Sequence, residues 1–417
     1  MDTDDWALRA AELDAADPLR TYRDRFLVAT DDDVVAYLDG NSLGRPLRAS
    51  AGRLNDFVTK AWAGRLIRGW DEEWLDLPLR IGDRLGETVL GAAPGQSTIG
   101  DSTTVLLYKL IRGAVELRPG RSEIVIDTDN FPTDRYVVEG IATELGLSVA
   151  WVRTDPRGGI EPGLLEPVLT ERTALVVLSH VAYRSGHLAD AATITRQAHD
   201  AGALILWDLC HSAGSVPIAL DDWGVDLAVG CSYKYLNGGP GSPAFGYLRH
   251  DHQQLFRQPV WGWMGRADAF EMGPGYEPAE GVRRLLSGTP AILGMLAVQD
   301  SLDLIAEAGM PALREKSIVL TEFAIDLHRA WLEPLGVELA SPTDPARRGG
   351  HVTVEHPAFR ALLDRLWARG VIPDFRAPQG LRLGLSPLST SFAEVLAGLA
   401  VIRDELAQLP PASSSTA

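Results

Sequence analysis

Short, nearly continuous hydrophobic runs recur through the middle of the chain and predict buried strands. Six runs, bounded by Gly, Asp or Ser, occupy residues 123–127, 148–152, 174–179, 203–208, 226–231 and 244–248. Because apolar and polar residues do not alternate within them, we expect both faces of these strands to be covered. Residues 190–201 carry a helical pattern between two of the runs. Strands that alternate with helices predict βαβ units and a mostly parallel sheet.

The pattern changes after about residue 295. A helix is predicted at 311–329, then strands at 337–340, 351–355, 371–375 and 381–385, with helices at 358–368 and 392–406. Residues 351–355 alternate, so we expect one face of that strand to be solvated. The chain therefore predicts an N-terminal arm (1–45) that can dock on either domain, a large domain (46–300), a small α+β domain (301–409) and a disordered tail (410–417).

Composition and charge narrow the class of protein. The 417 residues are 46% hydrophobic and 23% charged, a globular balance that excludes disordered, collagen-like and coiled-coil chains. The net charge of −17 disfavours binding to nucleic acid. Two cysteines are too few for a disulfide framework. The acidic N-terminus and the lack of a long apolar run predict no signal peptide, no membrane span and a cytoplasmic location.

Candidate chemistry follows two of the predicted central strands. Asp208 ends one strand, His211 comes three residues later, and Lys234 comes just after the next strand. Neighbouring parallel strands end at one edge of a sheet, where α/β folds bind ligands. A desolvated lysine there can form a Schiff base, and an aspartate facing a pyridinium nitrogen accompanies it in enzymes that use pyridoxal 5'-phosphate (PLP). A lone lysine after a strand is also often a surface residue.

Two further segments match what PLP needs. Residues 100–104 (GDSTT) precede an apolar helical run at 105–115, and helix N-terminal amides beside the Thr103 and Thr104 hydroxyls can bind a phosphate. The same pattern also serves as an ordinary helix cap. Phe131 and Asp134 offer an aromatic ring beside a second acid. The sequence thus contains candidates for holding the phosphate and the ring of the cofactor.

Other common motifs are absent from the sequence. We find no phosphate-binding P-loop, no zinc-protease motif and no nucleophile elbow. The glycine-rich residues 237–243 precede a strand and do not open a helix, which excludes a Rossmann fingerprint. His250 and His252 lack a nearby third ligand and are interpreted as a polar turn, so no metal site is predicted.

At these residues the sequence resembles the kynureninases, PLP enzymes of the aspartate-aminotransferase fold. Matching segments run in order from about Tyr37 to Ser391 and are 37–44 (YLDGNSLG), 131–134 (FPTD), 208–211 (DLCH), 222–226 (DWGVD), 231–237 (CSYKYLN), 262–265 (GWMG), 287–290 (SGTP) and 381–382 (LR). The resemblance implies fold type I of the PLP-dependent transferases, similar to class V aminotransferases. That fold has a mostly parallel seven-stranded sheet in the large domain and a small C-terminal α+β domain.

The resemblance also implies roles for individual residues. Lys234 matches the lysine that binds PLP, Asp208 the partner of the pyridine nitrogen, and Phe131 the ring that stacks on the cofactor. The other implied cofactor positions are Thr103, Thr104, Asp134, Ser179, His211 and Tyr233, together with Trp263 and Thr289 from the second subunit of a homodimer. Arg382 matches the arginine that binds the substrate α-carboxylate. We add Trp70, Asn41 and Ser42 as substrate candidates, although the latter two can simply form a turn.

The implied reaction is hydrolytic Cβ–Cγ cleavage of L-kynurenine to anthranilate and L-alanine (EC 3.7.1.3), with 3-hydroxy-L-kynurenine as another candidate substrate. Lys234 would remove the α-proton, Asp208 would keep the ring nitrogen protonated, and Tyr233 would act as an acid–base group. The family places this reaction in tryptophan catabolism and NAD biosynthesis. Thr289 after a glycine resembles the bacterial form that prefers kynurenine, whereas Arg266 stands where the family often has histidine.

Two alternative functions stay open at the level of sequence. One is another enzyme of the same fold, either a class V aminotransferase or a cysteine desulfurase. A desulfurase needs a cysteine on a mobile loop, whereas Cys210 lies beside a strand end and is interpreted as a small buried hydrophobic residue. The other is a catalytically silent binding protein, which the presence of Lys234, Asp208 and Arg382 disfavours.

Overall fold

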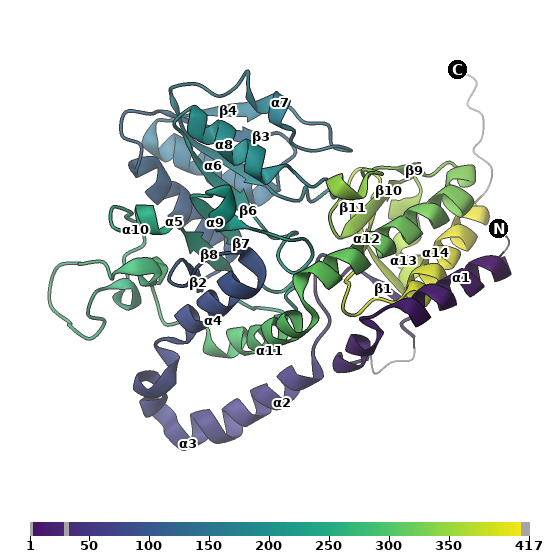
Figure 1. Cartoon of the computed structure of the whole chain (residues 1–417), viewed down its shortest axis with the longest axis horizontal. Helices are drawn as coiled ribbons and strands as arrows, with labels where there is room; N and C mark the ends of the chain where they lie inside the picture. The colour runs from purple at the N-terminus through teal and green to yellow at the C-terminus, as the bar shows by residue number, and fades with distance from the viewer. Residues whose placement is uncertain (1–2, 29–32, 410–417) are drawn as a thin grey trace.

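The computed structural model describes residues 3–28 and 33–409, so the tail predicted at 410–417 lies outside the described residues. Two sheets organise the fold (Figure 1). The larger has seven strands in the order β2-β8-β7-β6-β5-β3-β4. Its strands are β2 (Ser97–Ile99), β3 (Glu123–Asp127), β4 (Ser148–Val152), β5 (Thr173–Ser179), β6 (Leu204–Asp208), β7 (Leu227–Gly230) and β8 (Phe245–Leu248). Only β8 runs against its neighbours, so the predicted mostly parallel sheet is confirmed.

Burial explains why the central strands have continuous hydrophobic sequences. Along β5, Leu175 and Val177 belong to a core on one face of the sheet, whereas Val176 and Leu178 belong to the core on the other face. The helices around this sheet are α4 (Leu77–Leu85), α5 (Thr103–Glu116), α6 (Pro132–Leu145), α7 (Pro162–Leu165), α8 (Ala191–Asp200), α9 (Leu220–Trp223), α10 (His250–Gln253) and α11 (Ile292–Ala308). The expected double coverage is wrong for β4, where only Val152 is buried, because β4 is an edge strand.

The second sheet has the order β1-β11-β12-β10-β9. Its strands are β1 (Ala36–Leu38), β9 (Glu338–Leu339), β10 (His351–Glu355), β11 (Val371–Arg376) and β12 (Gly380–Gly384), accompanied by α12 (Met310–Leu327), α13 (Phe359–Ala368) and α14 (Phe392–Ala407). The expectation that β10 has a solvated face is wrong, since all five residues are buried. The strand lies between β12 and β9, and the Thr353 hydroxyl donates to the Arg184 carbonyl, so the large-sheet loops cover its polar face.

The N-terminal arm packs on the C-terminal part of the chain. Helix α1 (Thr3–Ala16) lies beside α14 (Figure 1), and the Trp6 ring centroid is 5.9 Å from that of Phe323 and 6.1 Å from that of Trp331. Strand β1 then pairs in parallel with β11. The arm finally reaches the large sheet, where the Gly44 amide donates to the Tyr233 carbonyl at 2.8 Å. The arm therefore links the two sheets.

Helices α2 (Arg48–Asp56) and α3 (Ala63–Arg65) follow the arm and extend along the lower side of the molecule in Figure 1. Arg53 anchors α2 through an ion pair of 2.8 Å with Asp300 of α11. Among the described residues, no helix has the length and apolar character needed to cross a membrane. The domain boundaries drawn from the sequence stay a prediction.

Candidate active site

Lys234 is buried at the C-terminal edge of the large sheet. Strands β6 and β7 are parallel neighbours, with Asp208 in register with Val229. The chain after β7 therefore brings Lys234 next to the chain after β6, and its Nζ lies 3.2 Å from Nε2 of His211. Lys234 is only 8% exposed, which rules out the surface lysine that the sequence left open.

A cavity of about 120 Å³ surrounds this amine. Its lining residues come from the N-termini of α5 and α6 and from the segments after β6 and β7. They are Thr103, Thr104, Phe131, Thr133, Asp134, Asp208, Cys210, His211, Tyr233 and Lys234. The fold thus brings together in one cavity eight residues that the sequence named as cofactor candidates. Helix α5 begins at Thr103, so its first-turn amides lie at one end of the cavity, where they favour an anion.

Asp134 and Asp208 form a buried pair of carboxyl groups. Asp134 is 2% and Asp208 is 5% exposed. Burial and the neighbouring Asp208 raise the pKa of Asp134 well above its usual range. The protonated form of Asp134 is therefore favoured, because ionising two adjacent carboxyl groups in a dry site is costly. One Asp208 oxygen accepts a hydrogen bond from the Cys210 amide at 2.7 Å, and a hydrogen bond also joins the Asp134 and Asp208 carboxyl groups.

This electrostatic arrangement fits PLP. A buried carboxylate with a neutral acid beside it suits a protonated pyridine nitrogen, because the pair then carries a single negative charge. At the other end, the α5 N-terminus suits a phosphate. Lys234 provides the amine for covalent attachment. The donor set therefore matches the three parts of the cofactor.

His211 is neutral in this environment. Burial and the positive charges of Lys234 and Arg382 lower its pKa well below the usual range. A neutral imidazole can accept a hydrogen bond at Nε2, so His211 can orient the Lys234 amine without carrying a charge. The effect of Arg382 on this pKa also shows that the arginine lies close to the cavity.

Arg382 lies on β12, is 1% exposed and reaches three parts of the structure. Its Nε donates to Asp374 at 2.6 Å, its Nη1 to the Tyr183 carbonyl at 2.6 Å, and its Nη2 to the Ser42 hydroxyl at 3.0 Å. Asn41 is fully buried beside Ser42, and both polar atoms of its side chain lack a partner among the described residues. Arg382 thus contacts the arm at Ser42, and the roles of Asn41, Ser42 and Arg382 in substrate binding stay predictions.

Several site residues were missed at the level of sequence. Asp374 pairs with Arg382, and Tyr183 supplies a backbone carbonyl that no side-chain pattern can indicate. Asp39 lies in the arm, and burial raises its pKa to about 6. His351 is fully buried, and its ring centroid is 5.7 Å from that of His211. The sequence did contain one signal for Asp374, since it is an acidic residue inside a predicted strand, eight residues before Arg382.

Other expected residues do not reach the cavity within this chain. Trp70 lines a separate apolar cavity of about 380 Å³ with Phe57, Trp62, Trp74 and residues 290–294. Trp263 is 38% exposed and packs against Phe270, and Thr289 is exposed. Ser179 is buried on β5 in register with Asp208, and its hydroxyl donates to Asn130 at 2.8 Å. Arg266 forms an ion pair with Glu271 of the same loop.

The cysteines and the paired histidines have other surroundings. Cys210 and Cys231 are free and buried, and Cys210 lines the Lys234 cavity. His250 faces the Pro94 carbonyl, whereas His252 binds Asp226, so the two rings have different partners. Within residues 3–28 and 33–409, no group of three His, Cys, Asp or Glu side chains is arranged to hold a metal ion.

Solved structures with a similar fold are PLP enzymes. The cysteine desulfurase of Thermococcus onnurineus NA1 superimposes with a TM-score of 0.78 at 19% identity, covering 90% of this chain and 95% of that chain. A variant of the enzyme C-DES, with glycine covalently linked to its PLP cofactor, gives a TM-score of 0.78 at 19% identity, with 91% and 98% covered. The chain therefore has the PLP-dependent transferase fold of type I.

Sequence comparisons specify the family. The profile described as the kynureninase C-terminal domain matches residues 313–402. A kynureninase of Burkholderia pseudomallei (strain 1106a) is 40% identical over 402 residues, or 95% of this chain and 94% of the relative. A kynureninase of Pseudomonas fluorescens is 40% identical over 388 residues, or 92% and 91%. With this identity over almost its whole length, the chain belongs to the kynureninase family.

Proposed function

We propose that this chain is a PLP-dependent hydrolase that cleaves the Cβ–Cγ bond of L-kynurenine and releases anthranilate and L-alanine. Membership of the kynureninase family over nearly the whole chain supports this activity. The observation that carries the proposal is the buried Lys234 amine in one cavity with the Asp134–Asp208 pair. When bound, PLP supplies an electron sink for the charge that develops on the substrate Cα.

The residues around the cavity hold the cofactor in this proposal. Lys234 attaches it, Asp208 faces the pyridine nitrogen, and Phe131 covers the ring. In its protonated form Asp134 carries no negative charge, so the ring nitrogen interacts electrostatically with Asp208 and not with Asp134. The phosphate is assigned to the start of α5 with Thr103 and Thr104, and Ser179, His211 and Tyr233 are assigned as further cofactor-binding residues.

Arg382 binds the substrate α-carboxylate. Its guanidinium is already oriented by Asp374 and the Tyr183 carbonyl, so little conformational entropy is lost when the carboxylate binds. The Ser42 hydroxyl accepts a hydrogen bond from the same guanidinium. The side-chain amide of Asn41, which has no partner among the described residues, offers both a donor and an acceptor to the substrate. Trp70 is assigned to the aromatic ring of the substrate, and because it lies outside the Lys234 cavity of its own chain, this contact requires a second copy of the chain.

Lys234 Nζ removes the proton from the substrate Cα and later returns it. The neutral His211 accepts a hydrogen bond from this amine and does not compete for the transferred proton. Tyr233 is the acid–base group for the later steps. Burial raises the pKa of the Tyr233 hydroxyl above its usual range, so it stays protonated and can donate.

The active unit is proposed to be a homodimer in which Trp263 and Thr289 of one chain complete the site of the other. Both residues lie outside the Lys234 cavity of their own chain. Large apolar side chains are also exposed, including Ile67 at 77% and Met272 at 76%, and contact with a second copy would bury such side chains. We further propose a cytoplasmic location, a role in tryptophan catabolism and NAD biosynthesis, and the division into an arm (1–45), a large domain (46–300) and a small domain (301–409).

The test of function is direct. Purified chain with PLP and L-kynurenine should produce anthranilate, followed by its fluorescence, and an equal amount of L-alanine. Rates with 3-hydroxy-L-kynurenine would establish the preferred substrate, and L-cysteine would test for sulfide release by a desulfurase. Folded, PLP-bound protein that makes no anthranilate would refute the proposal.

The shared site has its own test. Lys234→Ala and Trp263→Ala should each be nearly inactive, and mixing them should restore part of the activity, since mixed dimers then contain one intact site. Arg196→Ala, an exposed substitution on α8, is the matched control and should be fully active alone. Mixtures that stay inactive despite subunit exchange would contradict the shared site.

A further inference from the structure

The two cysteines of the chain lie side by side next to the active site. Cys210 comes two residues after the end of β6 at Asp208, and Cys231 comes directly after the end of β7. These strands are parallel neighbours with Asp208 in register with Val229, so two residues further along both segments Cys210 is opposite Cys231. The Sγ of Cys231 lies 3.8 Å from the Cys210 carbonyl oxygen, which shows that the two segments stay adjacent beyond the strands.

The side chains of the two cysteines face each other. Alternate residues of a strand point to the same face of a sheet, and Leu206 of β6 and Val229 of β7 belong to the same core. Continuing this alternation places Cys210 and Cys231 on that face, and a hydrogen bond joins their thiols. Neighbouring strands lie about 4.8 Å apart, which is within the range of about 4.4 to 6.8 Å that a disulfide spans between Cα atoms. The pair is therefore placed to form an intramolecular disulfide.

Cys231 is the more acidic thiol of the pair. Burial raises its pKa, but the hydrogen bond from Cys210 and the positive charge of Lys234 lower it to about 7. The hydrogen bond with Cys231 and burial raise the pKa of Cys210 well above its usual range. Because the thiolate is the form that attacks an oxidant, Cys231 reacts first and Cys210 is the thiol that closes the disulfide.

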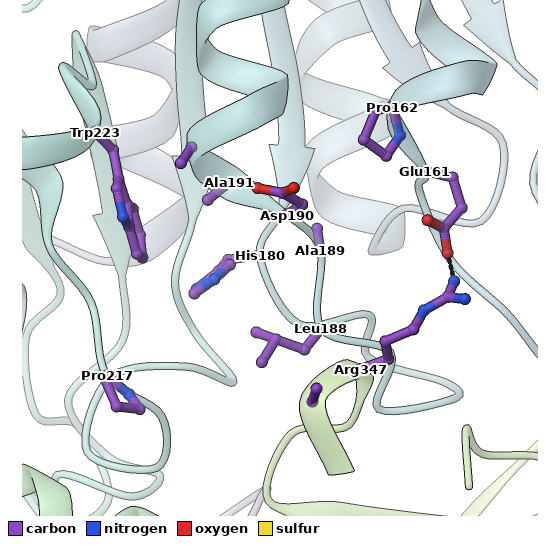
Figure 2. Close-up of a pocket in the computed structure, with 12 residues that line it drawn as sticks. Glu161, Pro162, His180, Leu188, Ala189, Asp190, Ala191, Pro217, Trp223 and Arg347 are labelled. Atoms are coloured by element: carbon purple, nitrogen blue, oxygen red, sulfur yellow. Dashed lines mark ion pairs between the residues drawn. The ribbon is translucent and has the colours of Figure 1, made fainter. Parts of the chain in front are cut away.

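A small oxidant can reach the pair through the Lys234 cavity. Cys210 lines this cavity of about 120 Å³ and is 8% exposed, whereas Cys231 is 2% exposed. A larger cavity surrounds His180 (Figure 2), and neither cysteine is among the residues that line it. The Lys234 cavity has room for hydrogen peroxide, which is about the size of two water molecules of about 30 Å³ each. PLP attached to Lys234 would occupy the same space, so cofactor and oxidant compete for one entry.

A disulfide between these cysteines changes two contacts of the cofactor site. The Cys210 amide donates to Asp208 at 2.7 Å, so movement of Cys210 displaces the carboxylate that faces the pyridine nitrogen. The Tyr233 hydroxyl forms a hydrogen bond with the Cys231 sulfur. That sulfur loses its negative charge when it enters a disulfide, and hydrogen bonds to uncharged acceptors are weaker. The oxidised chain is therefore expected to bind PLP less tightly.

We propose that Cys210 and Cys231 form a reversible disulfide with hydrogen peroxide as the oxidant, and that this disulfide weakens the binding of PLP. The geometric basis is the register of the two cysteines, the contact between their thiols and the position of Cys210 in the cavity wall. The proposal does not depend on which reaction the Lys234 cavity catalyses.

The oxidation proceeds in two steps. The Cys231 thiolate attacks one peroxide oxygen, so that an S–O bond forms while the O–O bond breaks. The departing hydroxide takes up the proton that the Cys231 thiol released and becomes water. The Cys210 sulfur then attacks the oxidised Cys231 sulfur, so that the S–S bond forms while the S–O bond breaks, and the hydroxyl leaves as water with the Cys210 proton. Two thiols are thereby oxidised to one disulfide, and one peroxide is reduced to two waters.

Peroxide treatment of the full-length chain, with and without bound PLP, tests the proposal. Without PLP, the intact mass under non-reducing conditions should show the loss of two hydrogens, and both cysteines should resist alkylation by iodoacetamide. The apparent Kd for PLP, followed by the absorbance of the lysine-bound cofactor, should rise by at least about tenfold and return to its starting value with dithiothreitol. Bound PLP should slow disulfide formation by at least about tenfold, because it occupies the cavity that leads to Cys210.

Two variants show whether the thiol pair is responsible. Cys231→Ala cannot form the disulfide, so its apparent Kd for PLP after peroxide should stay within about twofold of the value before treatment. Each variant is compared with itself, which removes any effect of the substitution on PLP binding. Ser317→Ala also removes one buried heteroatom, but on α12 and with both cysteines kept, so it is the matched control and should be oxidised as the parent is.

The outcomes separate this disulfide from other oxidative damage. An intramolecular disulfide that weakens PLP binding in the parent, with no such weakening in Cys231→Ala, supports the proposal. A parent chain that keeps two alkylatable thiols, or that forms only disulfide-linked chain pairs of twice the mass, overturns it. Equal loss of PLP affinity in Cys231→Ala, or a disulfide that leaves the affinity unchanged, also overturns it. If Cys231→Ala does not fold, Cys210→Ser decides by the same before-and-after comparison.

Discussion

Asp226 is a buried carboxylate whose removal should destabilise the fold by a predictable amount. It precedes β7 and accepts hydrogen bonds from Nε2 of His199 at 2.8 Å, Nε2 of His252 at 2.7 Å and the Ile205 amide at 2.9 Å. These groups belong to α8, α10 and β6, so one carboxylate ties together three elements around β7. The perturbation we consider is Asp226→Asn, which keeps the shape and removes the charge.

The expected cost follows from the pKa of Asp226. Burial alone would raise it, but the hydrogen bonds from His199 and His252 and the Ile205 amide lower it from 3.8 to about 2. A shift of about two units corresponds to about 2.5 kcal/mol at 25 °C. Because the folded pKa is lower than the unfolded one, this stability is fully present above the unfolded pKa. It is lost as the pH falls from 3.8 towards about 2.

Urea unfolding followed by circular dichroism measures the effect. At about pH 7, Asp226→Asn should lower the free energy of unfolding by about 2.5 kcal/mol, and the difference from the parent should shrink as the pH drops below about 4. Asp251→Asn is the matched control, because Asp251 is 66% exposed and pairs with the surface residue Arg249, and it should cost under about 0.5 kcal/mol. An Asp226→Asn loss equal to that of the control, or one independent of pH, would refute the reasoning.

Four further substitutions test the site and the arm. Lys234→Ala should abolish anthranilate formation and the absorbance of the lysine-bound cofactor while circular dichroism stays native; a retained band would contradict attachment at this amine. Asp134→Asn should keep kcat within about threefold, since the acid is already protonated, so a loss as large as that of Asp208→Asn (expected to exceed about a hundredfold) would show that Asp134 is ionised. Arg382→Lys should raise KM by at least about tenfold, because the planar fork is lost, and an unchanged KM would remove it from carboxylate binding. Trp6→Ala should cost about 3 kcal/mol in urea unfolding, and a negligible cost would show that docking of α1 contributes little to stability.

Strands and helices were predictable where the local pattern is complete. Strands β3, β4 and β10 have the residue bounds expected from the sequence, because their hydrophobic runs end at polar residues or glycines. The solvent exposure of a strand was less predictable from the sequence than its backbone conformation. Alternation in 351–355 indicated a solvated face, yet His351, Thr353 and Glu355 are buried, since loops distant in sequence cover the strand. The alternation of residues along a strand shows which side chains are polar. Whether those side chains are buried depends on the segments that pack against that face of the strand.

The candidate site was partly predictable for the same reason. Asp208 and Lys234 could be identified because Asp208 ends one strand and Lys234 follows the next, and neighbouring parallel strands end at one edge of a sheet. Trp70 and Trp263 lie outside the cavity of their own chain, because their positions depend on the path of α2–α3 and of the 260–272 loop. No periodic pattern encodes such paths.

The sequence by itself predicted a mostly parallel sheet whose strands alternate with helices, because these follow from local periodicity. Its resemblance to the kynureninases supplied most of the candidate residues for PLP. Tertiary structure alone decided the features that join distant segments. It placed Ser42 on Arg382 across 340 residues, docked α1 on the C-terminal helices, and made Asp134 a neutral acid by burying it beside Asp208. It also enclosed a second cavity around His180. Desolvation and long-range packing are properties of the assembled chain, which no single segment contains.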